Sequence, residues 1–174
     1  MNPMRTINIE KVTLNFGAGK EHARLEKGIK LLKKVTGIEP VKTVTMKRIP
    51  TWGLRPGLPI GCKITMRKKA ALDMFQRLLI AHDNTLHETQ FDQQGNIAFG
   101  IPEYIDVPGV KYDPELGILG FEVCITLARP GFRIKNRRIK ARKIPKRHRI
   151  SKEEAQRFMN EVYKVRITKQ GEEA

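Results

Sequence analysis

The chain of 174 residues carries 34 lysine and arginine side chains against 18 acidic ones, a formal net charge of +16 at pH 7. Its hydrophobic fraction of 40% is sufficient for a folded core, and its length favours one compact domain over two. Because such an excess of positive charge is self-repulsive unless a polyanion neutralises it, nucleic acid is the first candidate partner and an anionic membrane surface the second.

Cysteine usage and the N-terminus favour an intracellular protein. Cys62 and Cys124 have no CxxC motif or Cys/His cluster around them, so we expect no zinc site and two reduced, buried thiols. The opening MNPMRTINIEK lacks the apolar core of a signal peptide, and no apolar run approaches the ~18 residues of a membrane span. We therefore expect a cytoplasmic protein without a membrane partner.

The first part of the chain combines strands and a helix. Alternating apolar residues predict a strand over residues 7–16, and apolar steps of four and three predict a helix over residues 21–35 with Gly37 as its cap. β-Branched residues predict a strand over residues 41–49. The loop PTWGLRPGLP then leads into a strand over residues 60–66, so the pair is expected to form a long hairpin with an irregular tip.

Three further elements follow in the middle of the chain. Residues 68–82 show the apolar stripe of a second helix. Residues 85–92 and 96–101 are expected to form a hairpin around Gln93-Gln94-Gly95. Residues 121–127 alternate cleanly and predict a strand with one buried side.

The composition of the chain becomes strongly basic after Pro130. Residues 133–149, here called the basic segment, contain ten lysines and arginines in seventeen positions and almost nothing to bury. Ser151 to Glu154 has capping-box spacing, and a last short helix is expected to bury a stripe of Phe158, Val162 and Val165. The segment is typical of extensions that stay disordered alone and order against RNA.

Mixed helices and hairpin-linked strands predict a single α+β domain with a largely antiparallel sheet and helices packed on one face. A doubly wound parallel sheet is disfavoured. We expect residues 1–130 to form an RNA-binding core with a long basic hairpin loop at residues 49–59. Residues 131–174 would be a basic extension of the same domain, ending in the short helix.

The turn Gly17-Ala18-Gly19-Lys20 between the first strand and helix looks like a phosphate-binding loop. A Walker loop needs glycine where Leu14 stands and a hydroxyl residue where Glu21 stands, and a dinucleotide fingerprint needs glycine in place of His22. We therefore predict a tight turn whose backbone N–H groups can still meet an RNA phosphate. A nucleotide-dependent enzyme using this turn is the competing hypothesis.

No catalytic or cofactor-binding constellation is evident. The four histidines are dispersed, no Gly-x-Ser-x-Gly or HExxH motif occurs, and the acids sit singly among apolar or turn residues. The sequence therefore predicts a protein that is not an enzyme and has no metal or cofactor.

The positive charge is concentrated in two windows without any acid, residues 41–72 and 123–152. They hold twenty of the thirty-four cations. The first window contains Lys42, Lys47, Arg48, Arg55, Lys63, Arg67, Lys68 and Lys69. A merely solvated surface would mix both signs, so the windows predict RNA-binding surfaces. A chromatin-type DNA binder is the alternative, but folded RNA offers shape and 2′-hydroxyls that DNA lacks.

Trp52 lies in the hairpin loop between Arg48 and Arg55. An aromatic ring flanked by arginines can stack on a base while the cations hold phosphates. The ring can equally be a lid packed on its own hairpin, and the sequence leaves both interpretations open.

Three motifs carry a family resemblance. KVTLNFGAG, GLPIGCKITMR and FDQQGNIAFGI resemble the first strand, the G-x-P-I-G-x-K-x-T-L-R signature and the F-D-x-x-G-N-x-x-x-G-I signature of the universal large-subunit ribosomal protein five family, with Met66 in place of the usual leucine. The similarity extends from Asn2 to Tyr163. The opening NPMR and the ending RPGFRIKNRR…KRHRISKEEAQRF resemble the archaeal and eukaryotic branch.

The resemblance implies a structural protein of the central protuberance that binds 5S rRNA. The residues it assigns to 5S rRNA are Asn15, Gly17, Gly19, Lys42, Thr43, Lys63, Thr65 and Arg67. The hairpin loop with Arg48, Trp52 and Arg55 would face P-site tRNA. A further surface would contact 23S rRNA and a small-subunit head protein in an intersubunit bridge. Other rRNA contacts are expected at Arg133, Lys135, Arg137, Arg138, Lys140, Arg142, Lys143, Lys146, Arg147 and Arg149.

Overall fold

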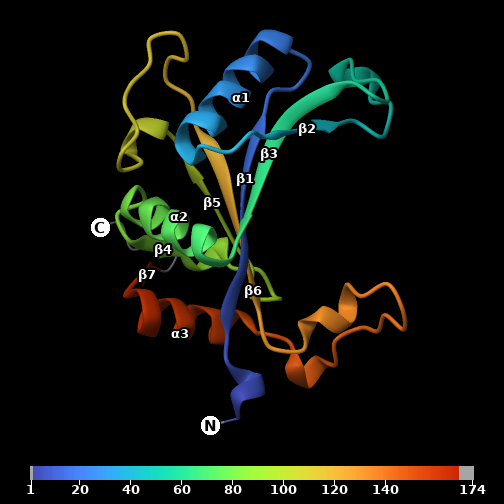
Figure 1. The fold of residues 1–174 in the computed structure, drawn as a ribbon, viewed down its shortest axis with the longest axis vertical. Coiled ribbons are helices and arrows are strands. Elements are labelled where there is room, and N and C mark those ends of the chain that lie inside the picture. The colour runs from blue at the N-terminus through green and yellow to red at the C-terminus, as the bar shows by residue number, and fades with distance from the viewer. Residues whose placement is uncertain (1, 169–174) are drawn as a thin grey trace.

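The structure, a computed structural model, describes residues 2–168 and has a five-stranded sheet at its centre (Figure 1). The strand order is β2-β3-β1-β6-β5, and every neighbouring pair is antiparallel. The strands are β1 (Asn8–Gly17), β2 (Val41–Val44), β3 (Pro59–Arg67), β5 (Ile97–Ile101) and β6 (Phe121–Ala128). The predicted α+β class with a largely antiparallel sheet is confirmed.

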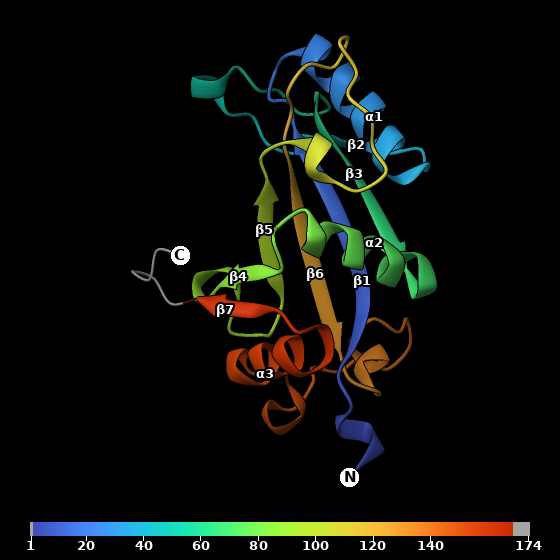
Figure 2. The ribbon, with the colours of Figure 1, turned by 90° about the vertical axis from the view of Figure 1, so that its left-hand side faces the viewer.

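Two helices cover one face of this sheet, as Figure 2 shows. They are α1 (His22–Thr36) and α2 (Lys68–Ile80). Gly37 ends α1 in the left-handed conformation and donates its N–H to the carbonyl of Lys33, so the predicted cap is confirmed. A third helix, α3 (Lys152–Tyr163), lies at the end of the molecule where β1 begins.

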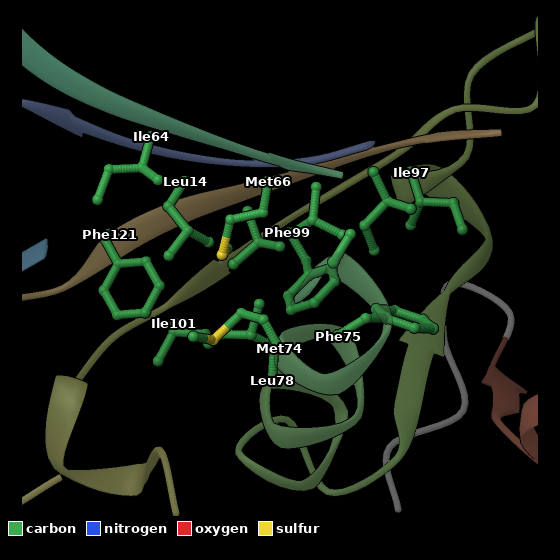
Figure 3. Packing of buried hydrophobic residues seen from close by; sticks show 14 of the residues in the cluster. Leu14, Ile64, Met66, Met74, Phe75, Leu78, Ile97, Phe99, Ile101 and Phe121 are labelled. Atoms are coloured by element: carbon green, nitrogen blue, oxygen red, sulfur yellow. The ribbon is translucent and has the colours of Figure 1, made fainter. Parts of the chain in front are cut away.

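The core lies between the sheet and the two helices (Figure 3). Leu14, Ile64 and Phe99 point from three strands toward Phe75 and Leu78 of α2. Along each long strand the buried residues alternate with exposed or half-exposed ones. Because successive side chains of a strand point to opposite faces, only one face of the sheet is buried.

A β-bulge explains the irregular apolar spacing of β1. The pairing of β1 with β6 shifts register between Ile9 and Lys11. One extra residue therefore separates Ile9 from Val12, whereas Val12, Leu14 and Phe16 follow the strict two-residue period and are buried.

The predicted hairpin over residues 85–101 is wrong. β4 (Thr85–His87) pairs in parallel with β7 (Arg166–Thr168), and only an isolated bridge joins Phe91 to Ile97. The correct partner of β4 is some eighty positions away. Local periodicity carries no information on such a distant pairing.

The predicted strand over residues 41–49 is too long, because β2 ends at Val44. Beyond it, the backbone N–H and the hydroxyl of Thr45 both donate to the carbonyl of Leu58, at 2.9 Å and 3.3 Å. The chain then forms a short 3-10 helix over Pro50–Trp52. The long hairpin itself is confirmed by the antiparallel pairing of β2 with β3.

The start of the last helix is confirmed, and its predicted buried stripe is confirmed in part. Ser151 and Glu154 form the capping box, with side chain and backbone bonded reciprocally at 3.1 Å and 3.3 Å. The helix buries Ala155 and Met159, whereas Val162 is 57% exposed. Of the predicted stripe, Val165 is buried and Phe158 packs against the core, so the prediction is wrong at Val162 alone.

The basic segment is more closely attached to the core than its composition suggests. Phe132 and Ile150, which flank it at its two ends, are buried, and Ile144 packs against the core. The buried residues therefore flank the segment, and the expectation that the segment itself has almost nothing to bury is modified at Ile144 alone. The end of the predicted extension, residues 169–174, lies outside the described residues.

Candidate nucleic-acid interface

The face of the sheet opposite α1 and α2, here called the open face, presents polar and small side chains. On β3 the exposed residues Lys63, Thr65 and Arg67 alternate with buried ones. They stand directly beside residues of β1 in the register Lys63↔Asn15, Thr65↔Thr13 and Arg67↔Lys11. Paired residues of neighbouring strands share a face, so these six side chains form one polar patch, half of it basic.

Most of the residues assigned to 5S rRNA gather on this face. Gly61 pairs with both Gly17 and Thr43, which extends the patch of Lys63 and its neighbours by one row. Lys42 does not belong to it. Its partner across the ladder is the buried Cys62, so the Lys42 side chain leaves the edge strand on the opposite face.

Gly61 keeps this row of the open face flat. A Cβ built on Gly61 would lie 2.5 Å from the carbonyl oxygen of Phe16 and 3.1 Å from the hydroxyl of Thr43. No larger residue fits without moving the backbone of β1. The glycine of the GLPIGCKITMR motif therefore has a packing role beside the candidate contact residues.

Two features of the open face were not evident from the sequence. The side-chain amide of Asn15 donates to the Glu122 carboxylate at 2.9 Å, which fixes the amide and places one acid among the cations. Cys124 is exposed on the same face, so the expectation of two buried thiols is wrong for this residue. Burial raises the pKa of the Cys62 thiol to about 11, which keeps that thiol neutral.

Two backbone N–H groups of the glycine turn are already bonded within the protein. The N–H groups of Ala18 and Gly19 both donate to the carbonyl of Ile60, at 2.9 Å and 3.1 Å. The expectation that these two groups meet an RNA phosphate is therefore wrong, and the same bonds count against a nucleotide loop. Gly19 lies in this turn, beyond the end of β1.

The hairpin loop presents an uncovered indole. Trp52 is 67% exposed, so it is not a lid packed on its own hairpin. The loop is closed below it by mutual backbone bonds of 3.0 Å between Ile49 and Leu54. Arg48 and Arg55 are exposed on either side. The exposed ring and cations are available to a base and its phosphates.

The ten cations of the basic segment are all exposed, and within residues 2–168 none forms an ion pair. Three of the five cations of α1 behave differently. Lys30, Lys33 and Lys34 lie 3.2 Å, 3.5 Å and 2.9 Å from the carboxylates of Glu115, Glu39 and Asp113. The unneutralised charge is thus concentrated in the two acid-free windows, as the sequence predicts.

The two windows border the open face at opposite ends. In Figure 1 the hairpin loop extends to the upper right and the basic segment to the lower right, on the side of the sheet away from α2. Between them lie the cations of β1 and β3. Cations thus lie at both ends and in the middle of one side of the sheet, where a long polyanion can contact them.

Arg129 anchors the basic segment, and sequence reasoning missed it. Although it is charged, only 6% of Arg129 is exposed. Its guanidinium lies 2.9 Å from the Glu154 carboxylate and donates to the carbonyl of Arg149 at 3.2 Å. Burial by itself raises the pKa of Glu154, but the Ser151 N–H and Arg129 outweigh it and hold that pKa below its usual value.

This pKa shift predicts acid sensitivity. Because the pKa of Glu154 is lower in the folded chain than in the unfolded one, its contribution to stability is present above the ordinary value of about 4.5 and is lost as the pH falls through the folded pKa. We expect the melting temperature of the wild type to exceed that of Glu154→Gln at pH 7, and the difference to shrink steadily below about pH 4.5. Thermal melts from pH 7 to pH 3 test this, and a difference independent of pH would contradict it.

The part of the chain that the structure describes gives no support for a metal site or a membrane-spanning helix. There, no group of three or more His, Cys, Asp and Glu side chains has an arrangement that could hold a metal ion. Nor is any helix within residues 2–168 sufficiently long and apolar to cross a bilayer.

Comparisons with known proteins agree with the charge pattern. Residues 2–55 match the family model described as "Ribosomal protein L5", and residues 59–158 match the model of the C-terminal part of the same ribosomal protein family. The chain is 46% identical over 168 residues to "Large ribosomal subunit protein uL5" of Sulfurisphaera tokodaii, covering 96% of this chain and 95% of that protein. It is 49% identical over 167 residues to the protein of the same name from Nanoarchaeum equitans, covering 95% and 98%.

Proposed function

The chain belongs to the ribosomal protein L5 family, in its archaeal-type branch, and from this membership we propose that it binds 5S rRNA through the open face and attaches it to the large ribosomal subunit at the central protuberance. It is a protein of the large ribosomal subunit in the cytoplasm, and this family is not a class of enzymes. Its role is therefore structural.

One structural observation supports the assignment of 5S rRNA binding to the open face. Lys63, Thr65 and Arg67 stand in register with three polar residues of β1 on a face that no helix of residues 2–168 covers. The cations can hold phosphates, while the threonine hydroxyls and the amide oxygen of Asn15 can bond 2′-hydroxyls or base edges. A flat sheet with both kinds of group suits a folded RNA.

Competition binding tests the proposal directly. The full chain is titrated with 5S rRNA and with an unrelated structured RNA of equal length at ~0.2 M salt, where weak non-specific contacts are largely lost. We expect 5S rRNA to bind more tightly and to outcompete duplex DNA. Equal affinity for the two RNAs would overturn the 5S assignment. Binding of ATP or GTP that Lys20→Ala removes would support the nucleotide-dependent enzyme instead.

We assign the hairpin loop to P-site tRNA. Its tip extends outward beyond the strands of the sheet (Figure 1), so a loop variant is expected to separate the two functions. Trp52→Ala with Arg55→Ala should leave affinity for 5S rRNA almost intact and weaken tRNA contact in assembled ribosomes. Filter binding of 5S rRNA and tRNA footprinting measure the two effects. Loss of 5S binding in this double variant would show that the loop assignment is wrong.

The remaining rRNA contacts are assigned to the second acid-free window, and the head protein to another surface. We place further rRNA contacts, including 23S rRNA, on the exposed cations of the basic segment. We place the 5S contacts on the core of residues 1–130. A small-subunit head protein would meet a further surface to form an intersubunit bridge. Crosslinking within purified ribosomes identifies the partner of each window.

A further inference from the structure

A pocket of about 330 Å³ lies where the basic segment folds back on the core. It is lined by the turn before β5, the end of β6 and both ends of the basic segment. Its size is at the low end of the ~300–1,000 Å³ that is usual for small-ligand pockets. It therefore admits one small group, not a duplex.

Three cations line the pocket without a carboxylate partner in the described chain, and contacts within the protein orient two of them. Lys135, Lys143 and Arg149 line it, and within residues 2–168 none of them has a carboxylate partner. The Nε–H of Arg149 donates to the carbonyl of Ile144 at 3.2 Å, which orients the guanidinium. Lys135 is held with its ammonium 5.3 Å from the centre of the Phe132 ring. These groups match the charge of a phosphate.

The opposite wall carries hydrogen-bonding groups on a rigid turn. The carboxylate of Asp92 accepts the N–H groups of Gln94 and Asn96 at 2.8 Å and 2.7 Å, and the side-chain amide of Asn96 at 2.7 Å. Gly95 in this turn lies so close to the start of α3 that an added Cβ would be 2.6 Å from Ile150. The FDQQGN motif is thus locked against the end of the basic segment.

This turn leaves polar groups free to meet a ligand. Within residues 2–168 no hydrogen bond engages the side-chain amide of Gln94 or the hydroxyl of Thr126, and both residues line the pocket. The amide offers a donor and an acceptor side by side, which is the pattern that a base edge requires. Between the polar wall and the cations lie Leu127, Phe132 and Ile144, which give the pocket an apolar floor.

We propose that this pocket binds a single unstacked nucleotide of an rRNA strand, with its phosphate at Lys135, Lys143 and Arg149 and its base edge at Gln94. The proposal rests on the proposed rRNA-binding function and adds a base-reading site to it. The occupant is part of a strand because the cations continue beyond the pocket. A second hollow of about 460 Å³, lined by Arg133 and Arg137, lies next along the same segment. Recognition of splayed-out bases is the usual way in which proteins read RNA sequence.

Paired variants in the full chain test the proposal. Gln94→Ala is compared with Gln93→Ala, an exposed neighbour in the same turn that does not line the pocket. Lys143→Glu is compared with Lys111→Glu, which changes net charge equally at an exposed position outside the pocket and outside both acid-free windows. Each protein is loaded onto large subunits stripped of it, and the bases of the rRNAs are probed by chemical modification.

We expect one unpaired base that the wild type, Gln93→Ala and Lys111→Glu protect. In Gln94→Ala and Lys143→Glu the reactivity of this base should rise about tenfold, as expected for loss of its local contacts. If no base shows this dependence, the pocket proposal is wrong. Displacement of the protection by millimolar free nucleoside monophosphates would equally overturn the assignment to a strand.

A parallel measurement separates the two proposals. Affinity for isolated 5S rRNA is determined for all four variants and the wild type. Preferential 5S binding without a pocket-dependent base overturns the inference and leaves the proposed function standing. A pocket-dependent base in 23S rRNA, without preferential 5S binding, overturns the 5S assignment and supports the pocket.

Discussion

Reversal of two charges on the open face, Lys63→Glu with Arg67→Glu, is expected to lower affinity for 5S rRNA by about 100-fold or more. Both side chains are exposed on β3 beside polar residues of β1, so their reversal leaves the core unchanged. Charge-assisted hydrogen bonds contribute about 1.5–3 kcal/mol each. Loss of two such bonds corresponds to two or more factors of ten, because each factor is about 1.4 kcal/mol.

The salt dependence distinguishes lost phosphate contacts from misfolding. The slope of log affinity against log salt should become shallower by about two in the double variant. Lys27→Glu with Lys111→Glu is the matched control. It gives the same change in net charge at exposed positions, one on α1 and one in the loop that pairs with α1. If the control lowers 5S affinity as much as the open-face variant, the interface is not on the open face.

Arg129→Met is expected to lower the free energy of unfolding by about 2–4 kcal/mol. Removal of one partner of a buried ion pair costs about 3–5 kcal/mol, and the partial exposure of Glu154 reduces this penalty. The substitution also releases the carbonyl of Arg149 at the end of the basic segment. Urea denaturation measures the loss, and hydrogen exchange should show faster opening of residues 133–149 than of β1 and β3.

Arg133→Met is the control for this substitution. It removes a cation four positions away that is exposed and unpaired within the described chain, so a change within about 0.5 kcal/mol is expected. A double-mutant cycle of Arg129→Met with Glu154→Gln isolates the pair from the backbone bonds. An additive result would show that the ion pair does not hold the segment.

The open-face variant and the Arg129 variant test two different roles of basic side chains, ligand binding and stabilisation of the fold. Lys63 and Arg67 are exposed and free for a ligand, whereas Arg129 serves the fold. Both kinds lie in windows without acids, and composition does not separate them. The difference is burial, because a buried guanidinium must find its partners within the protein.

Local patterns in the chain are sufficient to predict the class of fold, the ends of the helices, the segregation of charge and the family. These properties depend on composition or on neighbours within about ten residues. The alternation in β1, the cap at Gly37 and the Ser151 capping box are of this kind. The position of the hairpin was also visible, although β2 is shorter than its β-branched residues suggest.

Which residues act together depends on tertiary packing. The register of β2 against β3 puts Thr43 on the open face and removes Lys42 from it, a difference of one residue that propensity does not resolve. The pairing of β4 with β7, the contact of Arg129 with Glu154 and the pocket between Gln94 and Lys143 each join positions distant in the chain. Such contacts depend on how the layers pack, and local sequence patterns do not encode that packing.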